Sequence, residues 1–302
     1  MNIGFIFGSR STEHDVSIAS AFGIMQGFLK HTAHHLYPIF ITPTGQRVYE
    51  PDFLDPSKVN DLVHKDYSDL SFSIDFSKTG RFCATQKKKS FFKKPVHLDL
   101  DLIFLILHGK NGEDGTVQGI METVDVPYIS PSVLGSACGI NKIAMKDLFK
   151  ANEIPMVEQI FLKQQPEDLS EIESMGYPIF VKPVNLGSSI GVSKANNRKE
   201  LEQGLEVAFH YDNEVICEKG VENLAELNCS ILIDKGEVRH SFIERVNTKA
   251  NFLSFDEKYI AGGGTMQGIE EKVQIPAKIP EHVENQIYEL CTKVAKALHI
   301  DG

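Results

Sequence analysis

A polar turn that carries a carboxylate follows the first apolar segment of the chain. Residues 8–17 read GSRSTEHDVS and come directly after the apolar run 2–7. Ligands of open α/β sheets bind at the carboxyl ends of the strands. Glu13 could bind an ammonium group there, because a carboxylate supplies both negative charge and acceptor atoms. Alternatively, Ser11 or Thr12 caps the following helix, and Glu13 only interacts favourably with the positive end of the helix dipole.

A second polar turn follows another apolar run. Residues 108–115 read HGKNGEDG and come directly after the apolar segment 102–107. The three glycines of this turn allow the backbone to turn tightly and to approach a ligand closely. His108 could therefore face a substrate, although a purely structural histidine is an equally good interpretation.

A lysine and a glycine-serine loop form the third group. Lys182 lies inside the apolar segment 178–184, where an ammonium is costly unless it meets an anion. The adjoining residues 185–192, NLGSSIGV, supply backbone N–H groups and hydroxyls that can surround phosphate oxygens. No G-x-x-x-x-G-K-[ST] motif occurs in the chain, so this is not a Walker loop. Lys142 and the pair Glu218-Lys219 favour a phosphate site, whereas the alternative is that Lys182 faces solvent or a structural acid.

The elements before residue 130 must position the first two turns. The apolar runs 2–7, 36–41 and 102–107 lack polar alternation, which is typical of parallel strands covered on both faces. Ile18, Phe22, Met25 and Leu29 recur at helical spacing after the first run. The pattern predicts an open α/β domain.

The segment between the second and third strands contrasts with them. Residues 45–97 are rich in Ser, Asp and Lys and include KKKSFFKK at 87–94. Charge runs are usually solvated, so we expect a solvated hairpin or loop here and assign it no function.

Beyond residue 130 the regular βα alternation is lost. The sequence predicts α+β lobes with antiparallel sheets. The expected helices span 141–152, 198–210 and 281–299, and the expected strands span 178–184, 214–218, 226–233 and 237–245.

The composition is that of a globular protein with two or three domains. Of 302 residues, 42% are hydrophobic and 24% are charged, and the formal net charge is -10. This acidic balance argues against a nucleic acid or an anionic membrane as partner. The five cysteines form no C-x-x-C pair, and no apolar run approaches the ~20 residues of a membrane helix. We expect a cytoplasmic protein that is neither exported nor inserted in a membrane.

Taken in order, these motifs resemble those of the D-alanine:D-alanine ligases, ATP-grasp enzymes of peptidoglycan synthesis. The resemblance covers essentially the whole chain. It implies an α/β open-sheet domain over 1–131, then a two-lobed α+β ATP-grasp fold with a small central lobe over 132–216 and a C-terminal lobe over 217–302. ATP would be held between the two lobes. The matching segments are GSRSTEHDVS, LHGKNGEDGTVQG, NKIAMK, VKPVNLGSSIGVSK, ICEKG and DEKY.

The resemblance also implies roles for single residues. Glu13 would bind the ammonium of the first D-alanine within a hydrogen-bonded set completed by Ser188 and Tyr259, and His108 would lie beside that substrate. Other positions would bind the nucleotide: Lys142, Lys182 and Ser189 the phosphates, Glu218, Lys219 and Val221 the adenine, Glu226 the ribose, and Lys258 the terminal phosphate from a closing loop. The match at Glu226 requires one extra residue between 218 and 226.

These roles belong to one reaction. ATP phosphorylates the carboxylate of one D-alanine, and the amine of the second D-alanine attacks the resulting acyl phosphate. Lysines, backbone N–H groups and Mg²⁺ or Mn²⁺ would neutralise the negative charge, and loop closure would exclude water. The resemblance further implies a homodimer formed through the N-terminal domain.

One departure from the family concerns the end of the sequence. The family continues with G-x-x-R-x-D and then E-x-N, whereas this sequence ends at Asp301-Gly302. We therefore expect an incomplete C-terminal lobe that lacks the metal ligands and is inactive by itself, either as an incomplete record of a ligase or as a naturally shortened protein. A D-alanyl-D-serine or D-alanyl-D-lactate ligase, another ATP-grasp carboxylate-amine ligase and a catalytically dead nucleotide-binding protein remain alternatives. An R-x-D and E-x-N continuation of the reading frame beyond Gly302 would decide for an enzyme over the catalytically dead protein.

Overall fold

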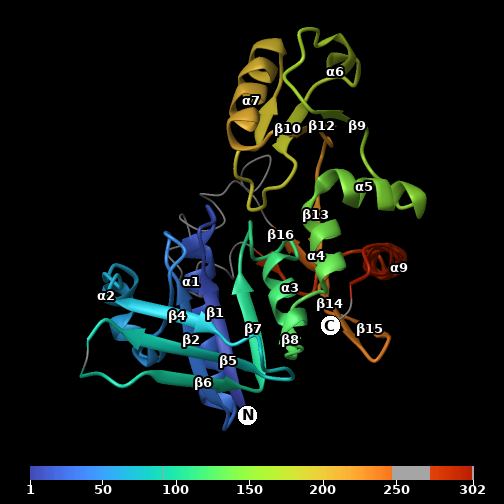
Figure 1. The fold of residues 1–302 in the computed structure, drawn as a ribbon. Coiled ribbons are helices and arrows are strands. Elements are labelled where there is room, and N and C mark those ends of the chain that lie inside the picture. The colour runs from blue at the N-terminus through green and yellow to red at the C-terminus, as the bar shows by residue number, and fades with distance from the viewer. Residues whose placement is uncertain (91, 247–272, 301–302) are drawn as a thin grey trace. The chain divides into compact units, whose positions relative to one another are not determined.

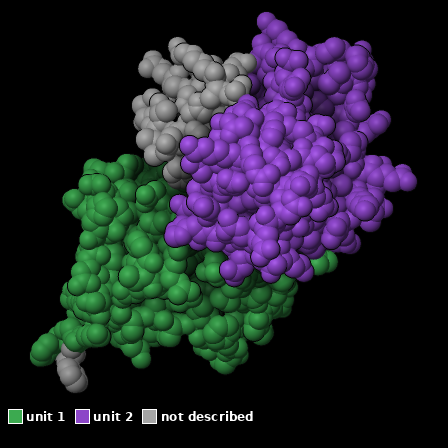
Figure 2. Space-filling view, turned by 90° about the horizontal axis from the view of Figure 1, so that it is seen from above, with its two compact units in different colours: residues 1–136 green, residues 137–302 purple. Residues whose placement is uncertain are grey.

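The computed structural model describes residues 1–90, 92–246 and 273–300. The chain divides into two compact units, residues 1–136 and residues 137–302 (Figure 2). No helix among the described residues is long and apolar enough to cross a membrane.

The first unit is built on the expected parallel sheet (Figure 1). The strand order is β3-β2-β1-β7-β8, and only β3 runs antiparallel to its neighbour. All three strands expected from the apolar runs are confirmed, and they lie side by side in the middle of the sheet. The strands are β1 (Asn2–Gly8), β2 (His35–Ile41), β3 (Arg47–Tyr49), β7 (Leu102–Leu107) and β8 (Tyr128–Ile129).

Helices cover both faces of this sheet. Helix α1 (His14–His31) packs Ala21 and Met25 against Phe5 and Phe7 on one face. Helix α3 (Thr116–Thr123) buries Val117 and Met121 on the other face. Helix α1 begins within the first polar turn and α3 directly after the second, so each turn is fixed at the carboxyl end of a central strand.

The expectation of a solvated hairpin or loop over 45–97 is confirmed for the hairpin and wrong for its solvation. With residues 98–100, the segment forms a second, antiparallel sheet, in which Phe82 and Leu98 are buried. Apolar residues at alternate positions, such as Leu98 and Leu100, bury one face of a strand while their neighbours stay exposed. The lysine run only marks the exposed end of a hairpin. The elements are the 3₁₀ helices Pro51–Leu54 and Pro56–Lys58, α2 (Val59–Val63), β4 (Leu70–Ile74), β5 (Phe82–Lys88) and β6 (Val96–Leu100).

The second unit contains the expected α+β arrangement. An antiparallel sheet of order β11-β10-β12-β9 packs against α7 (Arg198–Tyr211), which buries Leu201 and Leu205. Its strands are β9 (Gln159–Leu162), β10 (Ile179–Pro183), β11 (Ser193–Ala195) and β12 (Val215–Lys219). The helices α4 (Val133–Ile140), α5 (Lys142–Ala151) and α6 (Ser170–Ser174) complete this part of the chain.

Two expected long strands of the second unit are each divided in two. The segment 226–233 forms β13 (Glu226–Asn228) and β14 (Ile231–Asp234), and 237–245 forms β15 (Glu237–His240) and β16 (Glu244–Val246). The reason is that β14 pairs with β15, whereas β13 pairs with β16 in a different sheet. β17 (Val273–Gln274) extends that sheet, and α9 (Glu281–Ala297) confirms the expected last helix.

Candidate active site

Glu13 stands at the N-terminus of α1 with a buried side chain, only 2% exposed. Its side chain makes no capping hydrogen bond to the helix. The Ser11 hydroxyl, which was the alternative cap, instead accepts a hydrogen bond from the Glu13 backbone N–H at 3.0 Å. The Glu13 carboxylate is therefore buried without capping the helix.

The two polar turns are in direct contact. The Ser11 hydroxyl donates a hydrogen bond to the His108 carbonyl at 2.7 Å. A Cβ atom at Gly109 would lie 2.4 Å from Glu13 Oε2, and the φ of Gly109 is +68°. Only glycine allows the second turn to approach the Glu13 carboxylate this closely.

A cation-binding group results from this contact. Glu13, His108 and Glu113 each offer one ligand atom, and these three atoms lie within 4.8 Å of one another. His108 Nδ1 is 3.8 Å from Glu113 Oε1, and the Gly109 N–H donates to Glu113 Oε2 at 2.8 Å. Two carboxylates so close together attract a cation, either an ammonium group or a metal ion.

The electrostatics of Glu113 support this interpretation. Partial desolvation raises the pKa of Glu113, although its side chain stays 45% exposed, and the Glu13 charge raises the pKa further, whereas the Gly109 hydrogen bond and His108 lower it. A bound cation would relieve the repulsion between the two carboxylates. Sequence reasoning missed Glu113, although it lies in the same HGKNGEDG turn as His108.

A buried serine holds the frame of this group together. Ser17 is fully buried in α1, and its hydroxyl accepts a hydrogen bond from the Gly8 N–H at 2.8 Å. The same hydroxyl donates to the Ile106 carbonyl in β7. Ser17 therefore ties α1 to the carboxyl ends of β1 and β7, which carry the two turns.

In the second unit, a carboxylate is held by two lysines. Glu218 in β12 lies 2.7 Å from Lys146 Nζ and 2.5 Å from Lys182 Nζ. Lys146 also donates to Gln159 Oε1 at 2.9 Å. Ile179 and Val181 in β10 are buried in the core formed with α7, so Lys182 is placed by strand alternation on the opposite face of the sheet. Sequence reasoning missed Lys146, which lies one helical turn after Lys142.

The charges of this cluster do not cancel. Burial raises the pKa of Glu218, but the Lys182 charge and the hydrogen bonds from Lys146 and Lys182 outweigh burial, so the pKa lies below its usual value. Two ammonium groups therefore share one ionised carboxylate, which leaves a net positive charge. Lys182 faces a structural acid, as one interpretation of the sequence expected, and the excess charge still favours an anionic ligand such as phosphate.

Lys142, the first residue of α5, reaches the start of the glycine-serine loop. Its Nζ donates to the carbonyls of Val184 at 3.3 Å and Leu186 at 2.5 Å. Asn141 caps α5 by accepting from the Ala144 N–H at 2.9 Å and donates to Asn185 at 2.7 Å. The N-terminus of α5 is thereby fastened to the loop.

The loop itself adopts an uncommon backbone. Ser188 and Ser189 have φ values of 51° and 60°, in the left-handed region. Asp212 holds the beginning of the loop by accepting from the Asn185 N–H at 2.7 Å. Turns of this kind can direct backbone N–H groups toward an anion.

The remaining residues that the resemblance assigns to nucleotide binding lie at the end of β12 and beyond. Lys219 and Val221 are exposed, and Glu226 is half-buried at the start of β13. Lys258 and Tyr259 lie outside the described residues. Glu13 belongs to the first unit and Ser188 to the second. The joint Glu13-Ser188-Tyr259 set therefore stays a prediction.

Comparison with known proteins covers both units. A family model described as the D-ala D-ala ligase N-terminus matches residues 2–131, and one described as the D-ala D-ala ligase C-terminus matches residues 148–302. The chain is 35% identical over 300 residues to the D-alanine–D-alanine ligase of Enterococcus faecalis, covering 97% of this chain and 81% of that protein. It is 32% identical over 312 residues to the ligase of Bacillus pumilus, covering 100% and 81%.

Solved structures agree with these matches. The D-alanine-D-alanine ligase from Coxiella burnetii superposes with a TM-score of 0.78 at 23% identity, covering 100% of this chain and 78% of that one. The VanG D-Ala:D-Ser ligase from Enterococcus faecalis gives a TM-score of 0.74 at 28% identity, covering 99% and 83%. The expected fold class, an α/β domain followed by an ATP-grasp fold, is confirmed.

Proposed function

The chain belongs to the D-alanine–D-alanine ligase family, and on this premise we propose that it joins two D-alanines to D-alanyl-D-alanine with conversion of ATP to ADP and phosphate. The observation that carries the proposal is that one chain of this family contains both a carboxylate site and a lysine site. One site presents carboxylates suited to an ammonium group, and the other presents lysines suited to phosphates.

The first D-alanine would bind through its ammonium to Glu13 and Glu113. Glu13 is 2% exposed, so an ion pair formed there is poorly screened by water. His108 lies beside both carboxylates and would contact the substrate. An ammonium group suits the site better than a metal ion, because the substrates of a D-alanine ligase carry one.

ATP would bind in the second unit, where Lys142 and Lys182 meet its phosphates. Ser188 and Ser189 would add loop contacts, and the chain from Glu218 to Val221 would bind the adenine, with Glu226 on the ribose. The carboxylate of D-alanine attacks the terminal phosphorus, and ADP leaves. The amine of the second D-alanine then attacks the acyl carbon, and phosphate leaves. The lysines stabilise the charge on the transferring group, and Lys258 and Tyr259 would close over it.

Magnesium would neutralise further phosphate charge when bound. Glu218 does not suit it as a ligand, because both carboxylate oxygens already accept from lysines. The carboxylate ligands that the resemblance implies belong to the G-x-x-R-x-D and E-x-N motifs, and no described residue is matched to them. We therefore assign no metal ligand among the described residues.

Location and assembly form part of the same proposal. The five cysteines are free thiols, which suits a reducing cytoplasm. The homodimer rests on family resemblance alone, and light scattering on the purified protein would test it.

The experiment measures D-alanine-dependent phosphate release and identifies the dipeptide by mass spectrometry. It uses protein expressed from the full reading frame that contains these residues. D-serine and D-lactate are offered as second substrates, because the similarity to VanG makes a D-alanyl-D-serine ligase the second candidate. Phosphate release that does not depend on D-alanine would overturn the proposal.

A matched pair of variants tests the first site. Glu13→Gln should raise the KM for D-alanine about tenfold to a hundredfold, because a charge-assisted contact is lost, and should leave ATP affinity near normal. Asp15→Asn, an exposed carboxylate in the same turn, is the control and should change neither. Equal weakening of ATP and D-alanine by Glu13→Gln would contradict the assignment.

A further inference from the structure

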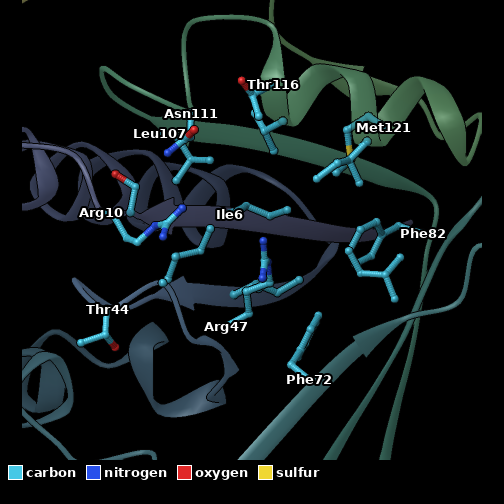
Figure 3. A pocket seen from close by; sticks show the side chains of 17 residues that line it. Ile6, Arg10, Thr44, Arg47, Phe72, Phe82, Leu107, Asn111, Thr116 and Met121 are labelled. Atoms are coloured by element: carbon cyan, nitrogen blue, oxygen red, sulfur yellow. The ribbon is translucent and has the colours of Figure 1, made fainter. Parts of the chain in front are cut away.

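A cavity of about 300 Å³ lies within the first unit, apart from the carboxylate group. One wall is the face of the parallel sheet that carries Ile6 and Ile39, and another is formed by the β4-β5-β6 sheet through Phe72 and Phe82. Helix α3 contributes Met121 (Figure 3). Most of the lining is therefore apolar, and the volume is at the lower end of the range for small-molecule sites.

Two arginines supply the polar part of this cavity. Arg10 reaches in from the end of β1 and Arg47 from β3, while Phe82 and Met121 lie at the far end from Arg10 (Figure 3). Neither guanidinium forms an ion pair with any described residue, and no residue of the lining is acidic. In a protein with a net charge of -10, this is a local surplus of positive charge.

The Arg10 side chain packs against a glycine. A Cβ atom at Gly45 would lie 2.8 Å from Arg10 Cδ, and the φ of Gly45 is +87°. The arginine stem therefore rests against the bare backbone of the turn between β2 and β3. Arg10 is otherwise exposed, and its guanidinium is directed at the cavity, as Figure 3 shows.

The cavity is distinct in chemistry from the proposed substrate site. Glu13, His108 and Glu113 are absent from its lining, and its charge has the opposite sign. The two sites share a border, since Ser9, Arg10 and Asn111 belong to the two polar turns. An ammonium compound would be repelled here, whereas an anion would be attracted.

We propose that this cavity binds a small amphiphilic carboxylate, with its carboxylate on Arg10 and Arg47 and its hydrocarbon chain among Ile6, Ile39 and the aromatic rings. Arginine suits this role because its forked donors match the two oxygens of a carboxylate. The apolar walls contribute affinity for each methylene removed from water. This inference does not depend on the ligase activity, because binding here requires neither ATP nor D-alanine.

The test is calorimetric titration of the 302-residue chain with octanoate, without nucleotide or amino acid. Hexanoate and octanol serve as probes of chain length and charge. Octanoate should bind about fifteenfold more tightly than hexanoate, because each methylene contributes about fourfold. Octanol should bind at least about tenfold more weakly than octanoate, because it lacks the charge-assisted contacts.

Variants locate the binding. Arg10→Met and Arg47→Met should each lower the affinity for octanoate about tenfold and leave the affinity for octanol unchanged. Lys78→Met, which removes an exposed cation from the same unit, should have no effect. Ile74→Phe, which enlarges a side chain of the lining, should weaken octanoate more than hexanoate.

Three outcomes would overturn the proposal. These are no binding of octanoate, octanol binding as tightly as octanoate, or octanoate binding unchanged in both arginine variants. Far-UV circular dichroism verifies that each variant is folded. If a variant fails to fold, the comparison of octanoate with octanol on the unaltered chain still decides the question.

Discussion

Lys146→Met should loosen the strand that carries Glu218. The Lys146 side chain is only 9% exposed, and its ammonium binds Glu218 at 2.7 Å and Gln159 at 2.9 Å. Methionine preserves most of the apolar stem but removes all the donors. Glu218, itself 11% exposed, would then depend on Lys182 alone.

The size of the effect follows from the burial of the three groups. Breaking a fully buried ion pair costs about 3–5 kcal/mol. Here Glu218 keeps Lys182 at 2.5 Å, and the Lys182 side chain is 27% exposed, so water can compensate part of the loss. The loss should therefore be close to that of one charge-assisted hydrogen bond, about 2 kcal/mol. That free energy corresponds to about a thirtyfold larger population of the opened strand.

Hydrogen–deuterium exchange with mass spectrometry is the appropriate assay. The chain has no tryptophan, and its two units make a single global unfolding curve ambiguous. Peptides from α5 and β12 report the second unit directly. In Lys146→Met, amides of β12 should exchange about thirtyfold faster than in the unaltered chain.

Lys150→Met is the matched control. Lys150 lies one turn later on α5, is exposed, and has no ion pair with any described residue. Its replacement should change exchange by less than about twofold. Equal exchange of β12 in the Lys146 and Lys150 variants would refute the view that Lys146 holds Glu218 in place.

Three further predictions concern the same two sites. Lys182→Met should weaken ATP about tenfold to a hundredfold by calorimetry, whereas Lys199→Met on the exposed side of α7 should not; an unchanged dissociation constant would place Lys182 outside the site. Because the pKa of Glu218 is lowered, its ionised form contributes stability above its unfolded pKa of about 4.5, and this contribution is lost as pH falls through the lower folded value. Between pH 5 and 3, roughly the range around the unfolded pKa, the β12 amides of Glu218→Gln should therefore lose less protection from hydrogen exchange than those of the unaltered chain, after correction for the intrinsic pH dependence of exchange. Equal losses would contradict this. Gly109→Ala should raise the KM for D-alanine without changing ATP affinity, since its Cβ would meet Glu13 Oε2 at 2.4 Å. Gly80→Ala, with a similar φ of +77° and open space around it, is the control for backbone strain. An equal rise of the KM in both variants would contradict the steric argument.

Local patterns determined much of the fold. The apolar runs at 2–7, 36–41 and 102–107 form adjacent strands of the parallel sheet. A strand covered on both faces needs apolar side chains at successive positions, so the local sequence identifies it. Helical spacing determined α7 and α9 for the same reason. The two polar turns could be assigned to one sheet edge because they directly follow parallel strands.

Other features depended on partners that are distant along the chain. The segment 45–97 is polar on average, and only pairing of β4, β5 and β6 shows that Phe82 and Leu98 are buried together. The split of 226–233 into two strands likewise reflects a change of sheet, which no local pattern encodes.

The sites show the same division. Residue type alone determined that Glu13 and Lys182 were suited to bind an ammonium and an anion. Tertiary structure decided that Gly109 approaches Glu13, that Glu113 completes the carboxylate pair, and that Lys146 shares Glu218 with Lys182. The physical reason is that charge and hydrogen-bonding capacity belong to a residue, whereas burial, distance and the resulting pKa belong to the surroundings that the folded chain builds around it.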